Sequence, residues 1–141
     1  MRSFDEYIKK HDVRKTTPDI GLAQSLKKDA EERVLFIIKL PLTDDSVSLV
    51  YEQIYEALRQ YIDALLILEG FKSYSHRASI SFLQRYPEFS LSEINKLDTA
   101  REKRNLSKYY AKKITIEETK DIIQLYHQVK PKLEGIFSKL I

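Results

Sequence analysis

One short segment of the 141-residue chain concentrates basic and aromatic side chains. Residues 101–113 hold six bases against one acid, a local charge of +5 in a chain whose net charge is +3. Lysine and arginine neutralise phosphates, and aromatic rings stack on nucleobases. The segment therefore predicts a binding site for RNA or a nucleotide. Its candidate residues are Arg101, Arg104, Asn105, Lys108, Tyr109 and Tyr110.

The same segment has a plainer interpretation, because basic residues near the C-terminus of a helix complement the helix dipole. Two of the candidates do not fit it well. Arg104 and Asn105 continue the apolar helical stripe of Leu91, Ile94 and Leu97. A buried arginine needs partners, and we expect a symmetric dimer contact or an anionic ligand to supply them.

The run from Arg101 to Tyr110 (REKRNLSKYY) follows a long apolar helical pattern over residues 51–70 and the link Phe71–His76. Taken together, these features resemble the HEPN domain (higher eukaryotes and prokaryotes nucleotide-binding), over about residues 45–137. The resemblance implies an all-α bundle that forms a homodimer. Many members are metal-independent ribonucleases, often toxins of toxin–antitoxin pairs whose partner is a separate nucleotidyltransferase chain. Their signature is an arginine followed four to six residues later by a histidine.

This chain departs from that signature at the histidine. Arg104 and the polar Asn105 are present, but Tyr109 and Tyr110 stand where the histidine is expected. A phenol titrates near pH ~10 and an imidazole near ~6.5, so tyrosine is a poor general base at neutral pH. We therefore expect binding of RNA or a nucleotide without cleavage.

Two alternatives stay open. In the first, the protein is a metal-independent endoribonuclease in which Tyr109, Tyr110 or His76 acts with Arg104 in place of the usual histidine. His76 is expected at the start of a short helix, from which it can approach Arg104 in the folded chain. In the second, the protein is a helical interaction module and the basic segment is only surface. His11 and His127 carry no comparable signal.

The composition excludes several other classes of site. With no cysteine, the chain has no disulfide, thiolate metal site or cysteine nucleophile. Its three glycines lie too far apart for a phosphate-binding loop. We expect no cofactor and no metal. No apolar run approaches the ~20 residues that span a bilayer, so we expect a cytoplasmic protein without a membrane segment. The abundance of Ile, Lys, Glu and Tyr favours a thermophilic source.

The elements that must position these residues are helices. We expect one domain over residues 1–141, an all-α, up-and-down bundle of four long helices plus one or two short ones. Capping boxes at Ser90 with Glu93 and at Thr115 with Glu118 mark two helix starts, and Gly70 marks a left-handed helix end. The long helices are expected over residues 18–40, 44–69, 91–110 and 116–141, a short one over 75–86, and an N-terminal arm or short helix within 1–16.

Overall fold

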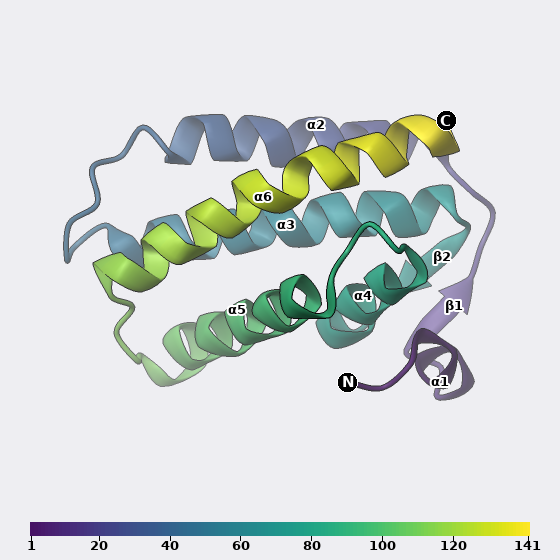
Figure 1. The fold of residues 1–141 in the computed structure, drawn as a ribbon, viewed down its shortest axis with the longest axis horizontal. Helices are drawn as coiled ribbons and strands as arrows, with labels where there is room; N and C mark the ends of the chain where they lie inside the picture. Colours follow the sequence, from purple (N-terminus) through teal and green to yellow (C-terminus); the bar gives the residue numbers. More distant parts are fainter.

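The computed structural model describes all 141 residues and confirms an all-α bundle of four long helices with two short ones (Figure 1). Two three-residue strands and one turn of 3-10 helix, η1, complete the fold. In chain order the elements are α1 (Phe4–Lys9), β1 (Val13–Lys15), α2 (Ile20–Ile37), α3 (Val47–Leu68), β2 (Phe71–Ser73), α4 (His76–Phe82), η1 (Leu83–Arg85), α5 (Leu91–Tyr110) and α6 (Ile116–Leu140).

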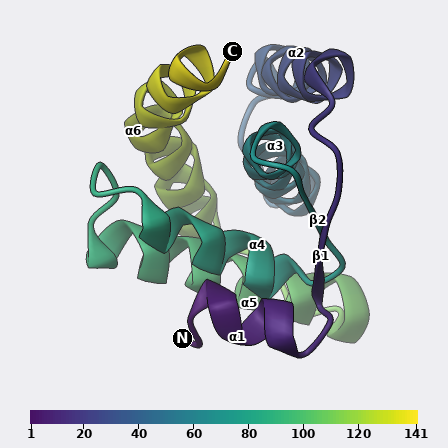
Figure 2. The ribbon, with the colours of Figure 1, turned by 90° about the vertical axis from the view of Figure 1, so that its right-hand side faces the viewer.

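Helix α3 is the central element of the fold. It lies between α2 on one side and the layer formed by α4 and α5 on the other, while α6 rises from that layer toward α2 (Figure 2). The second half of α3 is apolar on nearly all sides and is buried accordingly, with Tyr61 and Leu65 fully enclosed. Burial of this kind supplies most of the stability of a bundle.

The starts of α5 and α6 lie where the capping signals place them, whereas the helix expected from residue 44 begins at Val47. Ser90 with Glu93 and Thr115 with Glu118 form complete capping boxes, and α5 spans the expected residues 91–110. The predicted start of α2 at Pro18 is wrong by two residues. The carboxylate of Asp19 accepts a hydrogen bond from the amide of Leu22, so Asp19 is the N-cap and Pro18 remains outside the helix.

The pairing of β1 with β2 was not expected, because the sequence pattern predicts helices only. Val13 lies opposite Ser73, and the two strands run antiparallel. Gly70 has a φ of +82° and accepts a hydrogen bond from the amide of Thr16. A Cβ at Gly70 would lie 2.9 Å from the Thr16 carbonyl oxygen, so this close approach requires glycine. The strands are too short to show a sequence alternation.

The N-terminal segment is packed on the bundle rather than extended from it. Phe4 is buried and meets the rings of Phe71 and Phe82 edge to face, with centroids 5.2 and 5.1 Å away. Helix α1 thus covers the junction of β2 and α4, beneath the α4–α5 layer (Figure 2). No helix in the fold combines the length and the apolar character needed to cross a membrane.

Candidate functional site

Arg104 lies at the centre of a polar network between α5 and α3. Its side chain is almost completely buried, with 4% of the residue exposed. The Nε atom donates to Glu52 Oε2 at 2.9 Å, and Nη2 donates to Glu56 Oε1 at 3.0 Å. Nη1 donates to Asn105 Oδ1 at 3.2 Å. The partners of this buried arginine therefore come from its own chain, rather than from a second subunit or an anionic ligand.

Tyr55 and His76 extend the network to the start of α4. The Arg104 guanidinium lies over the Tyr55 ring, 5.5 Å from its centroid. The Tyr55 hydroxyl is 3.3 Å from Nδ1 of His76, within hydrogen-bonding distance. Burial, with the nearby cations Arg59 and Arg104, lowers the pKa of His76. The fold thus links a half-buried, neutral imidazole to the arginine through Tyr55, and the ribonuclease alternative needs both groups in one site.

Further charged groups line the same face and pair with one another. Arg101 binds Asp98 at 2.9 Å, and Arg59 binds Glu56 at 3.0 Å. Ser79 donates a hydrogen bond to Asp63, and burial raises the pKa of the Asp63 carboxyl to about 6. This α3–α5 face is charge-balanced, with four acids against four bases. They are Glu52, Glu56, Asp63 and Asp98, with Arg59, Arg101, Arg104 and Lys108.

The acidic half of this face was missed by sequence reasoning. Glu52, Glu56 and Asp63 recur on one stripe of α3, next to its apolar face. An acidic stripe of this kind is ordinary on a solvent-facing helix, so it gave no sign of a buried partner. Glu52 and Glu56 are covered by Arg104 of α5, which the sequence places about fifty residues away, and Asp63 by Ser79 of α4.

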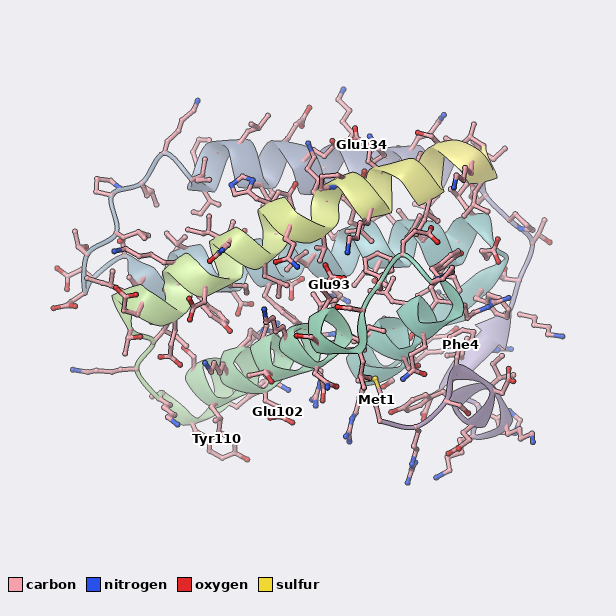
Figure 3. All side chains as sticks on the ribbon, viewed as in Figure 1. Met1, Phe4, Glu93, Glu102, Tyr110 and Glu134 are labelled. Carbon is pink, nitrogen blue, oxygen red and sulfur yellow. The ribbon has the colours of Figure 1, made fainter.

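The end of α5 differs sharply from the Arg104 network. Tyr109 and Tyr110 are 64% and 78% exposed, and Tyr110 projects away from the bundle (Figure 3). Ala111 adopts a left-handed conformation with φ of +55° and ends the helix, after which Lys112 and Lys113 are also exposed. We call residues 108–113 the exposed end of α5. The predicted site is therefore divided into a buried arginine network and an exposed basic and aromatic segment.

The remaining histidines stand apart, since His11 and His127 are both exposed. No three His, Asp or Glu side chains form a group that could hold a metal ion. Searches against models of protein families and against curated proteins find no match to this chain.

Proposed function

We propose that the protein is a HEPN-like homodimer that binds RNA or a nucleotide through the exposed end of α5 without cutting it. The observation that carries this proposal is the exposure of Tyr109 and Tyr110 beside lysines. Lys112 and Lys113 make no ion pair, and Lys108 is 4.0 Å from its nearest carboxylate, on Glu52. The free cations of Lys112 and Lys113 beside open aromatic faces suit the phosphates and bases of a single strand.

In this proposal the two parts of the predicted site have different roles. Lys108, Tyr109 and Tyr110 contact the ligand. Arg104 holds α5 against α3 through Glu52 and Glu56. Arg101 and Asn105 are bound within α5, by Asp98 and Arg104, so the polar groups of all three already have protein partners. A guanidinium neutralised by two carboxylates attracts a phosphate weakly, since the anion would meet the glutamates as well.

Binding of a fluorescent single-stranded RNA tests the proposal. We expect Tyr109→Ala with Tyr110→Ala to weaken binding at least tenfold, because stacking contributes about 1–3 kcal/mol per base. Each phosphate contact on a single strand contributes ~0.7 to the slope of log affinity against log salt. Lys112→Ser with Lys113→Ser removes two such contacts and should lower the slope by about 1.4. Fluorescence anisotropy over a salt series measures both effects.

Matched controls lie elsewhere on the surface. Tyr74 is an exposed tyrosine and Lys139 an exposed lysine, and neither belongs to the exposed end of α5. Tyr74→Ala and Lys139→Ser should leave the affinity unchanged. Binding that is absent, or that responds equally to both sets of variants, would favour the interaction-module alternative instead.

The homodimer is a separate expectation, with α5 at or near its two-fold axis. Leu91 and Leu106 expose apolar surface on α5 beside the charge-balanced α3–α5 face. A face with equal numbers of acids and bases can be complementary to its own copy. Light scattering at micromolar protein should give twice the 16.6 kDa chain mass, and Leu106→Glu should shift the mass toward the monomer. A strictly monomeric wild type would contradict this expectation.

Endoribonuclease activity remains the second candidate, and one observation favours it. His76 contacts Tyr55, whose ring packs against Arg104, so an imidazole and an arginine belong to one network that is joined through Tyr55. The partner chain that the resemblance implies, a nucleotidyltransferase, would be a separate protein. Co-purification with such a chain would support descent from a toxin–antitoxin pair.

A further inference from the structure

A cavity of about 360 Å³ opens between α5 and α6, away from the Arg104 network. The two helices diverge from the loop that joins them (Figure 1), and α3 contributes Tyr51 to the lining of the cavity. Residues of one face of α5 form one wall and residues of one face of α6 form the other. The volume lies within the range of natural small-molecule sites.

Tyr51 is a buried polar group that points to this cavity. Only 3% of the residue is exposed, and its hydroxyl makes no hydrogen bond to a protein group. The hydroxyls of Tyr61 and Tyr86 also lack hydrogen-bond partners, but these two oxygens are completely buried. The Tyr51 hydroxyl is not among the completely buried groups. The Tyr51 hydroxyl therefore reaches the cavity, where it can donate one hydrogen bond and accept another.

The charges that line the cavity indicate the class of its ligand. Lys103 and Glu118 neutralise one another at 3.2 Å. Lys96 on the α5 wall and Asp121 on the α6 wall make no ion pair. With two bases and two acids, the lining favours neither a phosphate nor a metal cation. An unpaired ammonium on one wall and an unpaired carboxylate on the other suit a molecule that carries both charges.

The remaining lining is half apolar and half polar, the polar half being Thr99, Gln124 and Gln128. Ala100 on α5 and Ile122 and Leu125 on α6 form the apolar half, and all three are buried. We propose that this cavity binds a free α-amino acid with an apolar side chain. Its carboxylate meets Lys96, its ammonium meets Asp121, and its side chain lies on the apolar surface. Tyr51 hydrogen-bonds the charged end. The site is independent of the exposed end of α5.

Titration of the intact protein with L-leucine and L-phenylalanine tests the proposal by NMR chemical shifts or calorimetry. We expect saturable binding, with shifts confined to α5, α6 and Tyr51. N-acetyl-leucine lacks the ammonium and leucinamide lacks the carboxylate, so each should bind at least tenfold more weakly than leucine. Those two ligands separate recognition of a zwitterion from simple filling of an apolar cavity.

Variants of the cavity give a second measurement. Tyr51→Phe and Asp121→Asn preserve side-chain shape, and each should weaken leucine binding several-fold. Asp45→Asn changes an exposed acid outside the cavity and should leave leucine binding unchanged. Equal binding of leucine and its two capped forms would overturn the proposal. So would the absence of any shift at ~10 mM amino acid, about tenfold above a millimolar Kd, or unchanged affinity in both cavity variants.

Discussion

Replacing Arg104 with alanine is expected to lower the free energy of unfolding by about 3 kcal/mol or more. Removal of one partner from a buried ion pair typically costs ~3–5 kcal/mol, because the opposite charge stays buried without compensation. Here two carboxylates, Glu52 and Glu56, would face each other and lose their shared donor. They are partly exposed, which places the expected cost at the lower end of that range. Urea unfolding followed by circular dichroism measures the change.

Three further variants separate a structural arginine from a ligand-binding one. Arg59→Ala removes a more exposed arginine that also binds Glu56, and should cost ~0–1 kcal/mol. Arg104→Lys keeps the charge but not the forked contacts, so an intermediate loss is expected. Arg104→Met with both glutamates changed to glutamine should recover much of the stability. If the Arg104→Ala variant is as stable as the wild type but does not bind RNA, the result would instead indicate that Arg104 contacts the ligand.

Arg104 also shows what could and could not be predicted from the sequence. The core-facing position of Arg104 was visible, because it continues a stripe of apolar residues along one helix. From that position alone we would have expected the variant to stay folded and to lose only ligand binding. The identity of its partners depends on how α3 and α5 pack against each other. Side-chain spacing within one helix carries no information about which residues of another helix it contacts.

Helix boundaries were the most predictable feature, because they depend on local chemistry. Ser90 and Thr115 with their glutamates define caps within four residues of chain. The antiparallel pair β1 and β2 was not predictable, since its partners lie almost sixty residues apart and each strand has only three residues. The approach of His76 to Tyr55 is of the same kind. From the sequence we expected His76 at a helix start from which it can approach Arg104, and its contact with Tyr55 depends on the packing of α4 on α3.

The wild-type protein is expected to cut RNA no faster than background in the absence of metal. General acid–base assistance typically contributes ~10²–10⁴-fold, and the histidine that supplies it in the resembled family is replaced here by Tyr109. Tyr109 is exposed, and its hydroxyl makes no hydrogen bond to a protein group. Burial raises the pKa of Tyr55, which removes that phenol as a base. A gel assay with end-labelled RNA and a chelator measures cleavage.

His76 is the one group that could contradict this expectation, because it is neutral at pH 7 and lies in the Arg104 network. A base alone is not sufficient, however. The charge that develops on the phosphate needs a free cation, and the Arg104 guanidinium is already bound by Glu52 and Glu56. Cleavage by the wild type that His76→Ala abolishes and the exposed-site control His127→Ala preserves would mean that RNA displaces those glutamates. Arg104 would then leave its structural partners during the reaction, and the network would be a resting state of a ribonuclease.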